Sequence, residues 1–231
     1  MGKVRVIAHR GASAYKLENT LSAVKLAFKM GADAVEVDVR LCADGEVVVI
    51  HDERVDRVTN GRGRVRELTV SELKRLKVGK EEKIPLLKEI LDLLPYGEKK
   101  LLVELKEPGL EKKVVNLVKE RNLEDYVEIA SFFHPSVKKV KELCPKIKTG
   151  VIFTCLPVDP VDLAFKAKAD ILIPRKDYVT INLIEEAHEN SLEVYTWVVD
   201  SEKEALKFKA MGVDGIATNK PDMVLKVIKG F

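Results

Sequence analysis

The sequence predicts an α/β protein of the (β/α)8-barrel class, also called a TIM barrel. Short apolar runs alternate with helical patterns along almost the whole chain, giving eight strand–helix units. The length of 231 residues suits one such barrel. A doubly wound sheet would favour a glycine-rich turn after its first strand, but that run ends in His9-Arg10-Gly11 and neither common phosphate-loop pattern occurs. We therefore expect a single barrel domain over residues 1–231.

The expected strands are short runs rich in Val, Ile and Leu. The second is strictly alternating, with valines on one face and Glu36, Asp38 and Arg40 on the other. Strands are expected over residues 4–8, 34–39, 100–105, 126–131, 147–153, 170–173, 193–198 and 215–217.

The expected helices carry start and stop signals. Asn19-Thr20 offers an N-cap to the first helix and Gly31 closes it, and a later helix is stopped at Pro95. Helices are expected over residues 21–30, 85–94, 110–121, 135–143, 160–167, 180–190, 201–211 and 221–229.

Residues 53–85 break this alternation. The stretch is charged, contains Gly61 and Gly63, and holds one short helical piece over residues 71–76. Its apolar content is too small to form a core of its own. We expect a small insertion after the second strand.

Bulk composition excludes several classes of protein. Hydrophobic residues make up 46% of the chain and charged ones 33%, with a net charge of only +3. Lys and Glu are interleaved along the helices, which is typical of solvated faces and not of a nucleic-acid surface. Three widely spaced cysteines favour a reducing, cytoplasmic setting, and no apolar stretch is long enough for a membrane span. Abundant Lys and Glu with no Gln is a composition that leans thermophilic.

A hairpin follows the second strand. Asp44-Gly45 is a turn signal, and the apolar return run ends in His51-Asp52. A two-residue turn would place Asp38 opposite His51. The carboxylates of Glu36 and Asp38 share a face with about 7 Å between their Cα atoms, close enough to converge on one ion.

A barrel carries its site at the carboxyl ends of its strands. Singly, each polar residue there has an ordinary interpretation, such as a solvated strand face or a hydrogen-bonded structural histidine. Together they meet at one end of the barrel, and buried acids need a partner such as a metal. The residues that map to this end are His9, Arg10, Glu36, Asp38, His51, Glu104, Lys106 and Trp197.

Residue type then indicates the chemistry. Glu36, Asp38 and Glu104 form a hard oxygen site that suits Mg²⁺ or Ca²⁺, with Mn²⁺ as an alternative, rather than zinc. Arg10 and Lys106 would neutralise an anionic substrate, and we expect that anion to be a phosphate. Two histidines beside that phosphate can act as general base and general acid. The constellation predicts metal-assisted cleavage of a phosphoester.

The motifs resemble those of the glycerophosphodiester phosphodiesterase family, in order and over almost the whole chain. The most specific combination is H-R-G at the start with E-x-D and H-D later, whereas V-E-L-K alone would be weak. The matching motifs are H-R-G at 9–11, E-N-T at 18–20, E-V-D-V at 36–39, D-G-x-x-V-x-x-H-D at 44–52, D-R-x-T-x-G-x-G at 56–63, V-E-L-K at 103–106 and G-V-D-G-I-x-T at 212–218.

The resemblance implies a TIM barrel that hydrolyses small-molecule glycerophosphodiesters to glycerol 3-phosphate and an alcohol. It implies that Glu36, Asp38 and Glu104 bind the divalent metal and that His9 and His51 are the catalytic acid/base pair. The same resemblance implies that Arg10 and Lys106 contact the phosphate and that Trp197 contacts the glycerol or the leaving group. Two positions depart from the family pattern: Leu17, where proline is frequent, and Asn219-Lys220, where an acidic–basic pair is common.

The order of proton transfer stays open at this point, with His9 favoured as base and His51 as acid. Attack by the substrate's own 2-hydroxyl, through a cyclic phosphate, and attack by water are both compatible with the residues. Oligomeric state, headgroup and metal identity are not defined by the sequence.

Two other functions compete with this one. A phospholipase C/D-like phosphodiesterase acting on lysophospholipid or another membrane-derived lipid would need an apolar rim, which Phe132, Phe133, Phe153 and Leu156 could supply. A non-catalytic barrel that binds phosphorylated ligands would have no need of two histidines around an acidic cluster.

Overall fold

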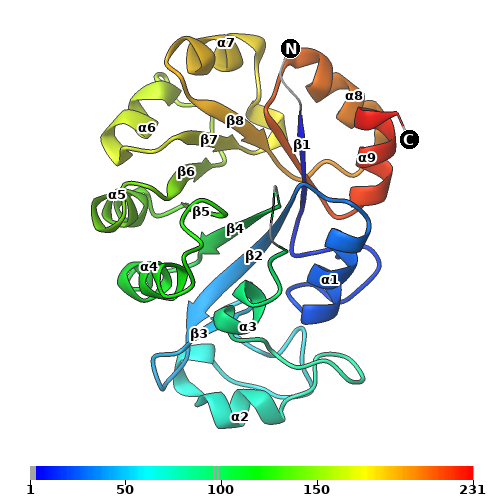
Figure 1. Cartoon of the computed structure of the whole chain (residues 1–231), viewed down its shortest axis with the longest axis vertical. Coiled ribbons are helices and arrows are strands. Elements are labelled where there is room, and N and C mark those ends of the chain that lie inside the picture. Colours follow the sequence, from blue (N-terminus) through cyan, green and yellow to red (C-terminus); the bar gives the residue numbers. More distant parts are fainter. Residues whose placement is uncertain (1–3, 96, 98, 231) are drawn as a thin grey trace.

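The computed structural model describes residues 4–95, 97 and 99–230, and most of its helices lie around the outside of the strands (Figure 1). Within these residues, eight parallel strands follow one another around a ring, and β1 closes it by pairing with both β2 and β9. The predicted (β/α)8 barrel is confirmed. The strands of the ring are β1 (Arg5–Ala8), β2 (Ala34–Leu41), β4 (Lys100–Leu105), β5 (Val127–Ser131), β6 (Lys148–Phe153), β7 (Ile171–Pro174), β8 (Glu193–Thr196) and β9 (Gly215–Thr218).

Side chains cap the starts of several helices, and the first of these caps, Thr20, was expected from the sequence. Thr20 Oγ1 accepts a hydrogen bond from the backbone N–H of Ala23, and Thr180 and Ser201 cap later helices in the same way. The helices are α1 (Leu21–Lys29), α2 (Val70–Arg75), α3 (Leu87–Leu91), α4 (Glu111–Lys119), α5 (His134–Leu143), α6 (Pro160–Ala167), α7 (Ile181–Glu189), α8 (Glu202–Met211) and α9 (Pro221–Lys229), with 3-10 turns η1 (Val65–Glu67) and η2 (Lys176–Tyr178).

Helix α3 is shorter than predicted. The expected helix spanned residues 85–94, but α3 begins only after Leu86, whose N–H donates to Glu89 Oε2. After Leu91 the chain continues in tighter turns toward Pro95, with the N–H of Leu94 bonded to the carbonyl of Leu91. A proline disfavours the α conformation of the residue before it, which is consistent with a helix that ends before Leu94.

The barrel interior is filled by apolar side chains, among them Ile7, Leu102, Ile173 and Tyr195. Larger clusters pack between the strands and the surrounding helices. Because the interior is filled by apolar side chains, the polar side chains of the strands converge at the two ends of the barrel and not in its middle.

The amino-terminal ends of the strands are closed by an ion cluster. Arg5 bonds to the buried Glu128 at 2.8 Å and also to Tyr195. Tyr195 in turn donates to Glu193. This cluster lies at the opposite end of the strands from the predicted site.

The hairpin after β2 has a register one residue different from the prediction. Strand β3 (Val47–Val49) pairs antiparallel with β2, with Val39 opposite Val49, and the N–H of Ile50 donates to the carbonyl of Asp38. The predicted pairing of Asp38 with His51 is therefore wrong. The connection has three residues because Gly45 adopts φ +70° after the turn, the usual form of a three-residue hairpin loop.

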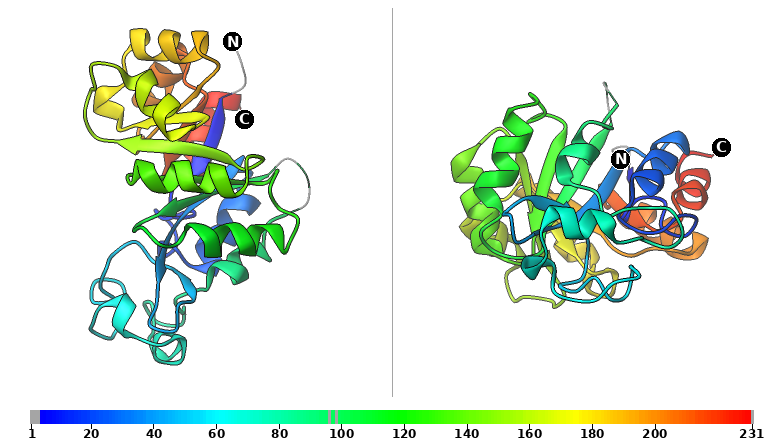
Figure 2. Two further views of the ribbon diagram at one scale, coloured as in Figure 1. Left: turned by 90° about the vertical axis from the view of Figure 1, so that its left-hand side faces the viewer. Right: turned by 90° about the horizontal axis from the view of Figure 1, so that it is seen from below.

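The segment after β3 forms a projection on one side of the barrel, where η1 and α2 lie (Figures 1 and 2). Its apolar side chains Val55, Val65, Leu73 and Val78 pack together with residues of the hairpin, including Ile50. The projection therefore shares its core with the hairpin that carries His51. Among the described residues, no helix is long and apolar enough to cross a membrane.

Candidate active site

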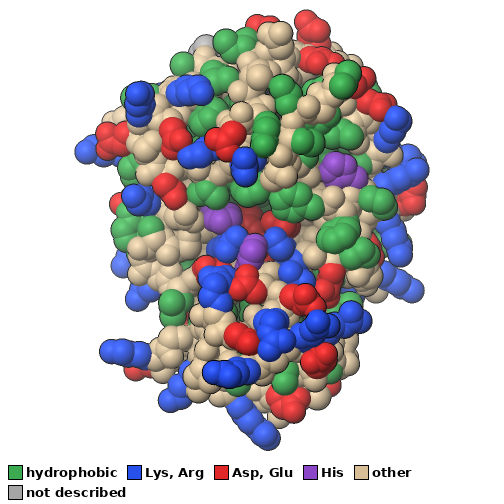
Figure 3. All heavy atoms as spheres, turned by 180° about the vertical axis from the view of Figure 1, so that it is seen from behind, with side chains coloured by type: hydrophobic (Ala, Val, Ile, Leu, Met, Phe, Trp, Pro, Cys, Tyr) green, Lys and Arg blue, Asp and Glu red, His purple; other side chains and the backbone are tan. Residues whose placement is uncertain are grey.

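Polar side chains from β1, β2, β4 and the hairpin gather at the carboxyl ends of the strands. Figure 3 shows histidine, acidic and basic side chains together near the centre of one face, with apolar side chains beside them. Strand β2 pairs with β4 so that Asp38 lies opposite Glu104, and Glu36 precedes Asp38 by two residues on the same face. The predicted carboxylates therefore meet: one oxygen from each lies within 4.8 Å of the others.

Asp38 is held by partners from three segments. Asn19 donates from Nδ2 to Asp38 Oδ2 at 2.8 Å and accepts from the backbone N–H of Asp38 at 3.1 Å. Arg10 Nε and Lys106 Nζ lie 3.2 and 3.4 Å from its carboxylate oxygens. Only 1% of Asp38 is exposed, so this carboxylate is fixed in place.

Glu36 and Glu104 are less fully neutralised. Glu36 accepts a hydrogen bond from the backbone N–H of Arg10 at 2.8 Å, whereas its Oε1 is buried without a hydrogen-bond partner among the described residues. Asp38 Oδ1 accepts no hydrogen bond from the described residues either, although Lys106 Nζ lies 3.4 Å away as an ion pair. Glu104 accepts from Lys106 at 2.6 Å. Buried carboxylate oxygens without donors fit a divalent cation, because hard oxygen ligands are what Mg²⁺ and Ca²⁺ bind.

The pKa values of the three carboxyl groups differ because Asp38 has more positively charged partners than Glu36 and Glu104 have. Burial, followed by the charges of Asp38 and Glu104, raises the pKa of Glu36 well above its ordinary value. Burial and Asp38 raise the pKa of Glu104 to about 7. Burial alone would raise the pKa of Asp38 as well, but Arg10 and Lys106 hold it below its ordinary value.

The raised pKa of Glu104 makes the stability of the metal-free protein depend on pH. Its pKa is about 7 in the folded chain against an ordinary value of 4.5. Protonated Glu104 therefore contributes fully to stability below its ordinary pKa of 4.5, and this contribution is lost as the pH rises through its folded-state pKa of about 7. Each unit of difference between the two pKa values corresponds to about 1.4 kcal/mol. In excess chelator, we expect the free energy of unfolding to fall over this range. Urea titrations of Glu104→Gln at several pH values should show a smaller fall. If the free energy of unfolding depended on pH equally in variant and parent, the raised pKa could not be assigned to Glu104.

The first turn depends on two consecutive residues with left-handed backbone conformations, Arg10 at φ +55° and Gly11 at φ +82°. A Cβ on Gly11 would lie 2.6 Å from the carbonyl carbon of Ala23 in α1. The turn directs the backbone N–H of Arg10 toward Glu36. Because a side chain at position 11 would collide with α1, the turn requires the glycine of the H-R-G motif.

A Gly11→Ala variant is expected to lower the free energy of unfolding by at least the roughly 1–3 kcal/mol of a strained backbone residue. Gly109 has a similar φ of +97°, but no atom of the part of the chain that the structure describes lies within 4 Å of the added Cβ. Chemical denaturation of Gly109→Ala therefore measures backbone strain without the clash. A Gly11 variant no less stable than the Gly109 variant would refute the packing argument.

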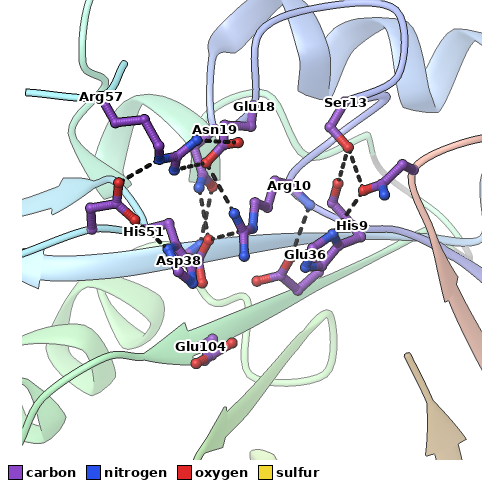
Figure 4. Close-up of polar contacts among 12 residues, drawn as sticks. His9, Arg10, Ser13, Glu18, Asn19, Glu36, Asp38, His51, Arg57 and Glu104 are labelled. Carbon is purple, nitrogen blue, oxygen red and sulfur yellow. Dashed lines mark hydrogen bonds and ion pairs between the residues drawn. The ribbon is translucent and has the colours of Figure 1, made fainter. Parts of the chain in front are cut away.

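The two predicted histidines lie on different sides of the carboxylates, with His51 beside Asp38 and His9 beside Glu36 (Figure 4). His51 Nδ1 lies 2.7 Å from Asp52 Oδ1, and His9 Nδ1 lies 2.8 Å from Asn219 Oδ1. Burial lowers the pKa of both. At His51 the carboxylates of Asp38 and Asp52 oppose this, whereas at His9 the leading opposing contact is the neutral amide of Asn219.

Ion pairs join the projection to the barrel at this point. Arg57 binds Asp52 through Nε at 2.5 Å and Glu18 through Nη2 at 2.7 Å. Glu18 also accepts from Arg10 at 3.0 Å. With His51 and Arg57 beside it, Asp52 has its pKa lowered to about 2, chiefly through its hydrogen bond with Arg57. Beside these residues lies a hollow of about 530 Å³, between the loop after β1 and the projection.

Trp197 forms part of an apolar wall. Its ring packs edge-to-face on Phe132 with 5.8 Å between centroids, and its Nε1 donates to the carbonyl of Ile173. Lys106 Nζ lies 5.8 Å from the centre of the Phe132 ring. A small cavity reaches from this wall to His9, Glu36 and Glu104.

Sequence reasoning assigned no contact at the site to six residues that the structure places there, and it expected Asn19 only at a helix cap. These are Glu18, Asn19, Asp52, Arg57, Asp200 and Asn219. The first four lie in motifs, E-N-T, H-D and D-R, that were recognised without a contact being attached to them. Asn19 clamps Asp38 from a left-handed conformation at φ +58°. Asp200 lies in no motif used above, and only the fold brings it to the site.

Fold and site together define a (β/α)8-barrel protein whose carboxyl-terminal face brings carboxylates, cationic side chains and histidines side by side. The sequence profile of the glycerophosphoryl diester phosphodiesterase family matches residues 9–223. A protein of Caldanaerobacter subterraneus subsp. tengcongensis named glycerophosphodiester phosphodiesterase is 39% identical over 98% of both chains. The chain therefore belongs to the glycerophosphoryl diester phosphodiesterase family, whose members are phosphoric diester hydrolases.

Solved structures agree with this assignment. A putative glycerophosphodiester phosphodiesterase from Galdieria sulphuraria superimposes with a TM-score of 0.90 at 29% identity, covering 98% of each chain. An Oleispira antarctica phosphodiesterase in complex with the product sn-glycerol-3-phosphate gives a TM-score of 0.89 at 27% identity, covering 97% of this chain and 96% of that one. The family resemblance recognised in the sequence and the expectation of an enzyme are confirmed.

Proposed function

We propose that this protein hydrolyses glycerophosphodiesters to glycerol 3-phosphate and an alcohol, using a divalent cation and two histidines. The observation that carries the proposal is the convergence of Glu36, Asp38 and Glu104, with oxygens within 4.8 Å of one another, between His9 and His51. The product named for the Oleispira antarctica relative supports the choice of glycerol 3-phosphate.

The three carboxylates would hold the cation, with Mg²⁺, Ca²⁺ and Mn²⁺ as the candidates. When bound, such an ion polarises a phosphoryl oxygen and lowers the pKa of a hydroxyl or water beside it. Arg10 and Lys106, which both pair with Asp38, would supply two further positive charges to a phosphate bound beside the ion.

The histidines would divide the proton transfers. His9 would accept the proton of the attacking oxygen, either a substrate hydroxyl or water, and His51 would protonate the departing alkoxide. His51 suits the second role because the Asp52 carboxylate faces its Nδ1 and stabilises the protonated ring. Asp52 is itself fixed by Arg57, so the projection positions the proposed acid. Trp197 and Phe132 would form the apolar wall of the substrate site.

Purified protein should release glycerol 3-phosphate from a panel of glycerophosphodiesters when Mg²⁺, Ca²⁺ or Mn²⁺ is present and should lose that activity in excess chelator. An enzyme-coupled assay for glycerol 3-phosphate measures this. Equal release with and without chelator would refute metal dependence, and no release from any substrate with any of the three ions would refute the reaction.

A second candidate function is cleavage of lysophospholipid or another membrane-derived lipid. One observation favours it: Phe132, Phe133 and Leu156 are 40, 43 and 54% exposed, and Phe132 lies against Trp197 at the edge of the site. Exposed apolar side chains beside a site suit a lipid chain. Faster turnover of micellar lysophosphatidylcholine than of glycerophosphocholine would select this function.

A further inference from the structure

Asn219, which is itself bonded to Asp200, contacts His9 through Nδ1. Asn219 directly follows β9, which pairs with β1, and the N–H of His9 donates to the carbonyl of Thr218. Asp200 lies in the loop between β8 and α8. Neither residue has a part in the chemistry proposed above.

Asp200 receives three hydrogen bonds from this segment. Its Oδ1 accepts from the hydroxyl of Thr218 at 3.0 Å and from the backbone N–H of Asn219 at 2.8 Å. Its Oδ2 accepts from Asn219 Nδ2 at 2.6 Å. An ionised carboxylate only accepts hydrogen bonds, so the amide group that faces Asp200 must be the NH2 of Asn219.

The orientation of the amide then determines the position of the His9 proton. With its NH2 on Asp200, Asn219 turns its carbonyl oxygen to His9 Nδ1 at 2.8 Å. The hydroxyl of Ser13 lies 2.7 Å from the same oxygen. Because this oxygen can only accept, Nδ1 must carry the proton, and the neutral ring keeps its lone pair on Nε2.

We propose that Asp200 and Asn219 are positioning residues that hold neutral His9 in the Nδ1–H tautomer and so present Nε2 as the general base. This inference rests on the proposed function, in which His9 accepts a proton. The two histidines are thereby made unequal: His9 faces an oriented amide, whereas His51 faces the carboxylate of Asp52. An amide fixes a tautomer without adding the negative charge that would stabilise the protonated ring.

The sharpest test is Asp200→Asn. An amide at position 200 that keeps accepting from the backbone N–H of Asn219 would direct its own NH2 at the NH2 of Asn219. Two donors cannot bond, so the amide of Asn219 is expected to turn over and donate to His9 Nδ1. The proton of His9 would then move to Nε2, and the general base would be lost.

Nitrogen-15 NMR of histidine-labelled protein reads the tautomer directly, above the ordinary histidine pKa of about 6.5. The chain has four histidines, and His134 and His188 serve as internal references because both bond through Nε2, to Ile152 and to Asp214. In the parent with Mg²⁺ we expect His9 as Nδ1–H. In Asp200→Asn we expect it as Nε2–H, with kcat for glycerol 3-phosphate release lowered roughly 10²-fold, the smaller end of what a general base contributes.

The exchanged pair, Asp200→Asn with Asn219→Asp, supplies the rescue. Its amide at 200 can donate to the carboxylate at 219, which again accepts from His9 Nδ1. We expect the Nδ1–H signal to return and kcat to recover to within about tenfold of the parent, since the base is restored. Asp214→Asn is the matched control, because Asp214 bonds to His188 at the amino-terminal ends of the strands. It should shift only the His188 signals and leave kcat unchanged.

A parent protein with His9 as Nε2–H would overturn the proposal, as would Asp200→Asn with an unchanged His9 tautomer. An altered tautomer without loss of kcat would overturn the catalytic part. Failure of the parent to release glycerol 3-phosphate would instead refute the proposed function, and the NMR result would still stand by itself.

Discussion

Replacing His51 by alanine is expected to lower kcat by about 10²–10⁴-fold, the range that a general acid or base contributes. In the proposed reaction this ring protonates the departing alkoxide, a poor leaving group without a proton. His51 lies beside Asp38, and the Asp52 carboxylate, itself bound to Arg57, fixes the ring. No other described histidine occupies that side of the site, so little of the loss should be recovered.

The loss should appear in kcat while metal binding, measured by calorimetry, stays near that of the parent, because the carboxylates remain. His134→Ala is the matched control. This histidine is the first residue of α5, and the hydrogen bond described for its ring is to the carbonyl of Ile152 and not to the three carboxylates. Near-normal turnover of glycerophosphocholine by the His51 variant would exclude it as the acid.

Replacing Glu36 by glutamine is expected to remove both metal binding and activity. The carbonyl of a glutamine can still accept from the N–H of Arg10, but its NH2 would direct protons toward the ion in place of Oε1. Replacing a residue that only orients a metal ligand typically lowers metal affinity about 10–100-fold. Loss of a ligand itself should therefore weaken metal binding by at least about 100-fold. The pKa of Glu36 is raised by burial, so loss of its charge should make the metal-free protein no less stable.

Glu128→Gln tests whether any buried acid would give the same result. Glu128 is 3% exposed and its pKa is also raised by burial, but it pairs with Arg5 at the other end of the strands. Isothermal titration with Mg²⁺ or Ca²⁺ should give parent affinity for this variant. Unchanged affinity in Glu36→Gln would remove this residue from the proposed metal site.

Much of the fold could be predicted because local signals agree with the tertiary structure. Helices α6 and α9 have the predicted bounds, since Pro160 and Pro221 fix their starts and left-handed residues end both. The alternation in β2 correctly placed Glu36 and Asp38 on one face, because a strand has a period of two. Errors arose where one residue matters: the turn at Gly45 added a residue to the hairpin and moved the partner of Asp38 from His51 to Ile50.

Some residues of the site could be predicted from the sequence, and others could not. Glu36, Asp38 and Glu104 could be brought together from sequence because adjacent parallel strands end at one edge. The partners that orient them could not. Arg57 reaches Glu18 across 39 positions, and Asn219 reaches His9 across 210. Such contacts depend on how loops pack after the barrel closes, which no local pattern encodes.

The most direct test of the proposed metal site is a crystal structure of the protein grown with Mg²⁺ or Ca²⁺ and glycerol 3-phosphate. We expect one cation bound by oxygens of Glu36, Asp38 and Glu104 at about 2.0–2.6 Å, with the phosphate on that ion. His9 and His51 should lie within hydrogen-bond reach of the phosphate and its oxygen substituents. A cation bound elsewhere, or a phosphate out of reach of both histidines, would contradict the proposed site.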